Sequence, residues 1–177
     1  MEDYQKVGYS KEVIEFVAVA KEYCEFIERS LEQDVVNLIN GMQKFLPLIY
    51  LKGSLLPSSE VEVEGLLEDY VTEQEYNYLL SGIFRVIGGQ YDEYLDVFDD
   101  AMQYSEEPIV QSISEKLCDI YQDLKNFISA FRCGIPDVME EALWNLNNNF
   151  ERYWGKSTVS VLRAVHAVSF QLLDKED

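Results

Sequence analysis

Three carboxylates spaced four residues apart are the first candidates for chemistry in this chain. Glu115, Asp119 and Asp123 form a row along one predicted helix, and convergent carboxylates can hold a divalent cation. This row is compatible with a metal-dependent hydrolase of a small phosphorylated or nucleotide substrate. The simpler interpretation is a solvated helix face on which Asp119 meets water and Asp123 pairs with a neighbouring helix.

Residues 142–173 form the second candidate site. They contain one acid, Glu151, and three bases, Arg152, Lys156 and Arg163, in a chain with 33 Asp and Glu, 14 Lys and Arg and a formal net charge of −19. Both tryptophans and the one histidine also lie here. A helical hairpin buried at the centre of a bundle would have a similar composition, because burial excludes charge.

A small-molecule pocket within this predicted hairpin would use His166 and Arg163 as polar anchors. A lone histidine on an apolar helix face is more often a hydrogen-bonded core residue than a catalytic base. No Ser/His/Asp or Cys/His signature accompanies His166. We therefore predict that His166 lies in the core and assign no catalytic residue.

Trp144 leads to our preferred hypothesis. The predicted core stripe of its helix consists of Met139, Ala142, Leu146, Phe150 and Tyr153. Trp144 projects from the opposite, polar side, where an indole needs a second packing surface. We predict a non-enzymatic interaction or regulatory domain that contacts a protein partner, or a second copy of itself, through Trp144, Asn148 and Arg152, since Trp and Arg often anchor interfaces.

The acidic composition argues against two classes of partner. Nucleic-acid binding needs clustered Lys and Arg, and an anionic membrane surface repels a negative protein. The apolar run Phe45–Leu51 is too short to span a membrane, and Met1–Tyr4 lack the apolar core of a signal peptide. We expect a cytoplasmic protein that binds neither nucleic acid nor membranes. The three cysteines form no CxxC motif, so we predict free thiols and no cofactor.

The elements that must position these residues are helical. A chain of 177 residues with four prolines and nine glycines fits one domain with long uninterrupted segments. Apolar periodicity predicts helices over about 10–31, 31–55, 72–87, 90–102, 113–133, 136–154 and 157–173. The predicted fold is an all-α, single-domain bundle of six or seven mostly antiparallel helices over residues 1–177, with an acidic loop at about 57–71 and frayed ends.

Local signals support several of these boundaries. Ser10 is a predicted N-cap, and Thr72 with Glu75 and Ser112 with Glu115 have the spacing of capping boxes. Lys52 follows a wholly apolar run, so we expect a carboxylate to pair with it.

Three segments together resemble a known family. They are Leu46–Lys52 followed by Leu55-Leu56-Pro57, Ser114–Lys125, and Ala142–Trp144 with Asn149–Gly155 and Leu162–His166. Over about residues 42–170 the chain resembles a bacterial domain of unknown function found in Bacteroides-like organisms. The resemblance implies a cytoplasmic, all-helical domain. It implies no activity, so it assigns no functional residue.

Overall fold

Helices make up most of the computed structural model, which describes residues 9–61 and 64–174. They are α1 (Lys11–Glu28), α2 (Val35–Ser54), α3 (Glu73–Ile87), α4 (Gly89–Asp92), α5 (Ile113–Phe131), α6 (Pro136–Asn149) and α7 (Gly155–Leu173). Over this part of the chain the predicted all-α bundle is confirmed, with one small two-stranded sheet added. The fraying predicted for the ends concerns residues 1–8 and 175–177, which lie outside the described residues.

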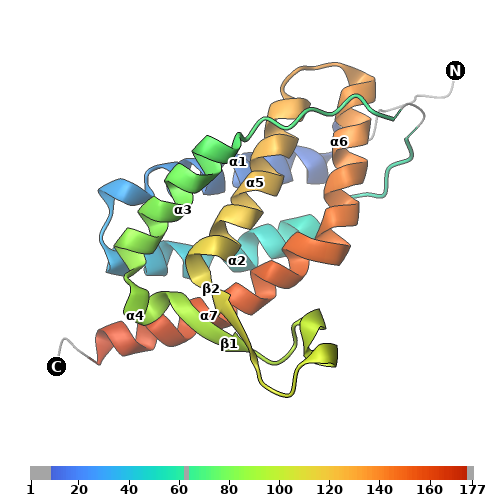
Figure 1. The fold of residues 1–177 in the computed structure, drawn as a ribbon. Coiled ribbons are helices and arrows are strands. Elements are labelled where there is room, and N and C mark those ends of the chain that lie inside the picture. Colours follow the sequence, from blue (N-terminus) through green and yellow to red (C-terminus); the bar gives the residue numbers. More distant parts are fainter. Residues whose placement is uncertain (1–8, 62–63, 175–177) are drawn as a thin grey trace, which may run out of the picture.

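The helix α5 is the central element of the bundle. It packs against α1, α3, α6 and α7, while α7 packs most extensively against α2 (Figure 1). Apolar side chains recur along α5 with helical spacing, and Ile113, Leu117, Ile120, Leu124 and Ile128 are buried. None of the described helices is long and apolar enough to cross a membrane.

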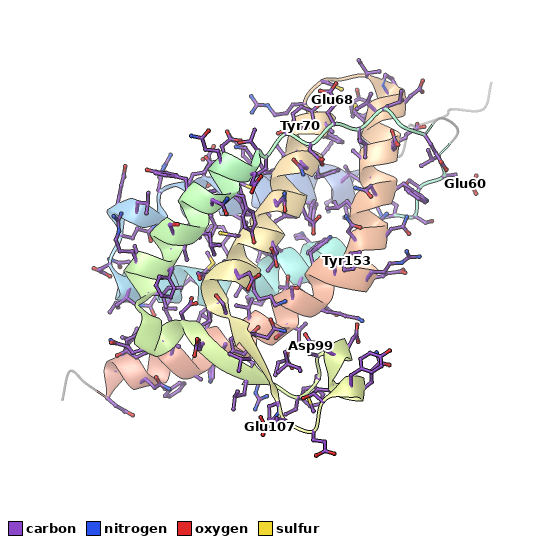
Figure 2. All side chains as sticks on the ribbon, viewed as in Figure 1. Glu60, Glu68, Tyr70, Asp99, Glu107 and Tyr153 are labelled. Atoms are coloured by element: carbon purple, nitrogen blue, oxygen red, sulfur yellow. The ribbon has the colours of Figure 1, made fainter. Side chains whose placement is uncertain are left out.

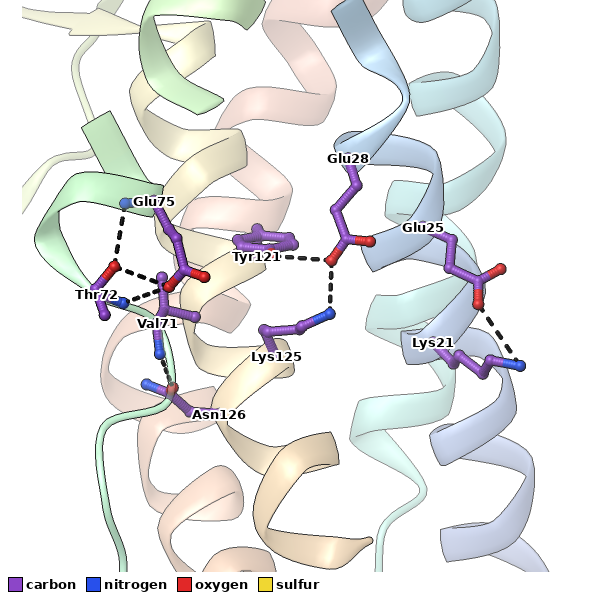
Figure 3. Close-up of polar contacts among 9 residues, drawn as sticks. All are labelled: Lys21, Glu25, Glu28, Val71, Thr72, Glu75, Tyr121, Lys125 and Asn126. Atoms are coloured by element: carbon purple, nitrogen blue, oxygen red, sulfur yellow. Dashed lines mark hydrogen bonds and ion pairs between the residues drawn. The ribbon is translucent and has the colours of Figure 1, made fainter. Parts of the chain in front are cut away.

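Side chains begin several helices where the sequence predicts. The Thr72 hydroxyl accepts the Glu75 N–H, and the Glu75 carboxylate accepts the Thr72 N–H, which completes the capping box that begins α3 (Figure 3). Ser10 caps α1 by accepting the Val13 N–H. The start of α2 was predicted too early, because Asp34 caps it by accepting the Asn37 N–H at 2.8 Å after a short 3₁₀ turn at Ser30–Glu32.

Polar contacts join the outer helices to α5 and to each other. One carboxylate oxygen of Glu28 on α1 accepts from the Tyr121 hydroxyl at 2.9 Å and from Lys125 Nζ at 2.6 Å (Figure 3). The ion pair predicted for Lys52 is confirmed, because its Nζ lies 2.6 Å from Glu15 Oε2. Both contacts tie α1 to a neighbouring helix.

The segment between α2 and α3, predicted as an acidic loop, forms neither helix nor strand over its described residues, 57–61 and 64–71. It runs across one end of α5 and α6 (Figure 1). The buried carboxylate of Glu141 accepts the N–H groups of Gly65 and Leu66, each at 2.7 Å. The Asn126 side-chain oxygen accepts the N–H groups of Tyr70 and Val71. These bonds satisfy loop amides and hold the segment in place.

The helix predicted over residues 90–102 is wrong. The segment forms strand β1 (Glu93–Asp96), which pairs antiparallel with β2 (Ile109–Ser112), and a 3₁₀ turn at Asp100–Tyr104 lies between them. The carboxylate of Asp92, which is 2% exposed, accepts from the Ser112 hydroxyl and the Ser114 N–H. That carboxylate anchors the hairpin to the start of α5, a long-range contact that helical periodicity cannot reveal.

The segment 142–173 is also different from the prediction, since it is no hairpin. Residues Phe150–Trp154 form a π-helical turn, and the chain passes through it from α6 into α7 without a loop (Figure 1). The Gly155 N–H bonds to the Phe150 carbonyl, and a Cβ at Gly155 would overlap that oxygen. Because the wider turn shifts the helical phase, Trp154 becomes 1% exposed and Tyr153, predicted in the core, is 62% exposed.

The substitution Gly155→Ala tests this junction. Alanine normally stabilises a helix interior by up to about 1 kcal/mol relative to glycine. Here the added Cβ meets backbone that cannot rotate away, so we expect unfolding free energy to fall by about 1–3 kcal/mol in urea denaturation. Gly89→Ala is the matched control, because its Cβ would make only an ordinary contact with Phe84. A stabilised Gly155→Ala variant would contradict this account of the turn.

Candidate functional site

A cleft of about 1130 Å³ lies beside the α6–α7 junction; we call it the main cleft. Its walls come from α5, α7, the π-turn and the β1–β2 hairpin, and Tyr50 of α2 also contributes. Figure 2 labels Tyr153 on the π-turn and Asp99 on the hairpin, which belong to two different walls of the cleft. The chain changes direction between α6 and α7 (Figure 1), and the start of α7 and the hairpin both line the cleft.

Aromatic rings form the part of the main cleft nearest the core. The rings of Tyr50 and Phe150 lie 5.2 Å apart, and those of Phe150 and Trp154 lie 4.6 Å apart. Trp154 is held because its Nε1 donates to the Leu146 carbonyl at 3.0 Å. The ring faces give this side of the cleft a rigid, apolar lining with polar groups around it.

A chain of hydroxyl groups holds the hairpin wall against α7. The Ser160 hydroxyl donates to Asp96 at 2.6 Å, so its oxygen accepts from the Tyr94 hydroxyl at 2.8 Å. The Phe98 N–H donates to the other oxygen of Asp96. Burial raises the pKa of Tyr94 to about 12, which keeps its hydroxyl protonated as the donor. Lys156 adds an ion pair to Asp100 at 2.8 Å.

Two carboxylates of α5 face the main cleft. Asp119, predicted to face water, is only part-exposed and accepts from the Tyr76 hydroxyl at 2.6 Å. Asp123 pairs with a neighbouring helix as predicted, because Asn149 Nδ2 of α6 donates to it at 3.3 Å. Burial raises the pKa of Asp123 to about 6, and the nearby charge of Asp119 adds to the shift.

Basic side chains follow one side of α7 and the turn before it. Arg152, Lys156 and Arg163 all line the main cleft, and Lys116 faces it from α5. Lys156 and Arg163 are seven residues apart in α7, nearly two helical turns, so they fall on one face, and Arg152 reaches the cleft from the π-turn. The three bases of the segment 142–173 therefore converge on one cavity, which explains why this segment stands out in an acidic chain.

The structure brings together only part of the predicted sites. Of those residues, the main cleft is lined by Arg152, Arg163, Asp119 and Asp123. Trp144, Asn148, His166 and Glu115 do not line it. The prediction that His166 lies in the core is wrong: it is exposed and its ring lies 5.0 Å from that of Phe170. The buried face of α7 consists instead of short side chains, among them Val161, Ala164 and Val165, which let α7 approach α2.

The predicted metal site stays a prediction. Among the described residues, no group of three or more His, Cys, Asp or Glu side chains is placed to hold a metal ion. Asp119 and Asp123 share the cleft, whereas Glu115 lies at the first turn of α5. Cys24, Cys118 and Cys133 are free thiols, as the sequence predicts.

Sequence reasoning missed the hairpin side of the site. Tyr94, Asp96 and Asp100 lie on a segment predicted as helix, and Ser160 was not singled out. One signal was available, since Pro108 precedes the β-branched pair Ile109-Val110. A proline at the edge of a β-branched pair is typical of a strand start.

The substitution Asp123→Asn tests the buried carboxyl. Its folded-state pKa of about 6 lies above the ordinary 3.8, so ionisation costs the folded state stability as pH rises from about 4 to 6, and the cost stays above that range. Asparagine removes this cost and keeps an oxygen for Asn149. We expect the variant to be more stable in urea denaturation by about 1–3 kcal/mol at pH 8 and by about half as much near pH 5.

Glu107→Gln, an exposed position at the hairpin, is the control and should show no comparable pH-dependent gain. If the difference between Asp123→Asn and the natural chain does not change with pH, the carboxyl is not buried as described.

Comparisons with known proteins place the chain in a family. A crystal structure of protein BF1032 from Bacteroides fragilis matches with a TM-score of 0.82 and 37% sequence identity, over 92% of this chain and 94% of that one. A comparison with curated proteins gave no match. The family described as Domain of unknown function (DUF5063) matches residues 7–171, nearly the whole chain. The chain therefore belongs to this family, as the resemblance in its sequence indicates.

Proposed function

We propose that the protein is a binding domain whose main cleft holds a small organic molecule. The observation that carries the proposal is the cleft itself, about 1130 Å³ with aromatic rings on one side and polar walls around them. Ligand sites in proteins typically combine a concave, largely apolar lining with a few placed polar groups. The π-turn at its edge fits this interpretation, because such turns are frequent at functional sites.

The walls of the cleft support a pre-formed site. The hydroxyl chain through Ser160 and the ion pair of Lys156 fix the hairpin relative to α7. Around the opening, Tyr153 and Phe98 are 62% and 84% exposed. Large exposed rings beside a cleft are surfaces that a ligand can cover. We assign binding and no reaction, since His166 does not line the cleft.

A metal-dependent hydrolase of a phosphorylated or nucleotide substrate stays a prediction. In its favour, Mg²⁺ is commonly held by one or two carboxylates together with substrate phosphates, and Asp119 and Asp123 both line the main cleft.

Filling the cleft tests the proposal. Ala167 lines it from α7, and Ala167→Trp should place an indole in the space that a ligand would occupy. In a fragment screen of the full chain followed by amide chemical shifts, we expect shifts at residues 94–100 and 150–167 that this variant loses. Ala18→Trp, at an exposed position of α1 outside the cleft, should keep them. Fragments that bind both variants equally, or bind none, would contradict the proposal.

The preferred sequence hypothesis, a partner surface at Trp144, keeps one observation in its favour. Trp144 is 40% exposed on α6, next to the exposed Asn145, and lines neither the main cleft nor the smaller pocket of about 290 Å³ between α5 and α6. A partly exposed indole offers apolar area to a protein partner or a second copy. Of the three residues predicted for this surface, only Arg152 lines the main cleft.

The substitution Trp144→Ala separates a surface role from a core role. Because the indole is partly exposed, we expect unfolding free energy to fall by less than about 1 kcal/mol, well below the 3–5 kcal/mol of a buried tryptophan. In sedimentation velocity at high protein concentration, the natural chain should self-associate and the variant should not. A natural chain that stays monomeric rejects self-association, and a variant that unfolds makes Trp144 structural.

A further inference from the structure

The acids and the bases that line the main cleft differ in whether they have hydrogen-bond partners within the protein. All five aspartates that line it accept from donors within the protein. Their donors are Ser160 and Phe98 N–H for Asp96, Gln111 for Asp99, Lys156 for Asp100, Tyr76 for Asp119 and Asn149 for Asp123. These bonds give each aspartate an acceptor role within the protein, although only Asp100 is paired with a cation among the described residues.

The bases are in the opposite situation. Lys156 has Asp100, but Lys116, Arg152 and Arg163 make no hydrogen bond or ion pair with any residue in the described part of the chain. Glu151, exposed beside Arg152, is the lining acid that likewise has no such partner. Three unpaired cations face one unpaired anion. The lining as a whole holds four cations and six carboxylates, a formal charge of −2, so an anion is favoured here only by direct hydrogen bonds to the cations that lack a partner.

The chemistry of the unpaired groups narrows the ligand. A guanidinium presents a planar fork that matches the oxygens of a phosphate or a carboxylate with two parallel hydrogen bonds. Arg152 and Arg163 are separated by 11 positions, roughly 16 Å along a helix, so both reach one ligand only if it is extended or if their long side chains converge. Tyr50 and Phe150 offer ring faces between these positions and the core.

We propose that the ligand of the main cleft is an organic dianion, a phosphomonoester or a dicarboxylate, held by Arg152 and Arg163 and carrying a flat apolar part against Tyr50 and Phe150. This inference rests on the function proposed above. A neutral ring leaves both guanidinium groups without an acceptor, whereas a phosphomonoester or a dicarboxylate offers enough oxygens for both. Because the negative chain repels anions at long range, affinity for a dianion requires direct contact with these cations.

Isothermal titration of the full chain at low salt tests the inference with four probes: adenosine monophosphate, terephthalate, inorganic phosphate and adenosine. We expect at least one of the organic dianions to bind at least tenfold more tightly than adenosine. Arg152→Met and Arg163→Met keep the apolar stem and remove the charge, and each should weaken that binding by roughly tenfold or more. Arg85→Met, at an exposed site on α3 outside the cleft, should bind as the natural chain does.

The probes distinguish a phosphate from carboxylates as the anionic part of the ligand. Binding of adenosine monophosphate without terephthalate supports a phosphomonoester, and the reverse supports a dicarboxylate. Inorganic phosphate that binds as tightly as the nucleotide overturns the role given to the rings. Dianion binding that both arginine variants retain overturns the residues assigned to it.

The two proposals fail differently. If fragments occupy the cleft and are displaced by Ala167→Trp, but none of the anionic probes binds better than adenosine, the anion class is wrong and the binding function stands. If neither fragments nor anions bind in the cleft, both proposals are wrong. Circular dichroism of each variant, compared with the natural chain, shows whether a loss reflects binding or folding.

Discussion

The packing of Trp154 at the α6–α7 junction is the constraint on which the site depends. Its indole is 1% exposed, lies 5.9 Å from the Phe16 ring and occupies the space over Gly53, where a Cβ would overlap it. A tryptophan this deeply buried stabilises a fold by several kcal/mol. Because the indole contacts α1 and α2, its position sets where α6 ends and in which direction α7 leaves.

That direction decides which side chains reach the cleft. With Trp154 directed into the core, the wider π-turn directs Arg152 outward and brings Lys156, Ser160 and Arg163 of α7 onto the face opposite the hairpin. The hairpin then has two kinds of attachment. Asp92 joins its base to α5, and Tyr94, Asp96 and Asp100 join it to α7. The cavity therefore depends on an apolar junction at one end and on polar bonds at the other.

Much of the fold was predictable from the sequence, because its signals are local. The stripe of α5 repeats with helical spacing, and Ser10 and Thr72 cap helices through bonds that span three residues. The prediction failed where distant contacts decide. Tyr94 pairs with Ser160, 66 positions away, and that contact favours a strand over a helix. The side-chain assignments of Tyr153 and His166 failed because a π-turn shifts the phase of a helix, and because short residues, not leucines, form the contact of α7 with α2.

The candidate site was predictable in composition and not in geometry. The low acid content and the clustered bases of residues 142–173 pointed to a segment that in part lines the cleft, but burial and binding leave the same composition. Only the fold shows that Leu146, Trp154 and Val165 of this segment face the core while Arg152 and Arg163 face a cavity. Lys156 links the α7 wall of the cleft to the hairpin wall. It holds the hairpin through Asp100 at an exposed ion pair, which is a weak contact, so an anion that reaches Lys156 competes with Asp100 for it. An anion bound to Lys156 would therefore weaken the attachment of Asp100, and with it this part of the hairpin, to α7. The bonds among Tyr94, Ser160 and Asp96 hold the strand in either case.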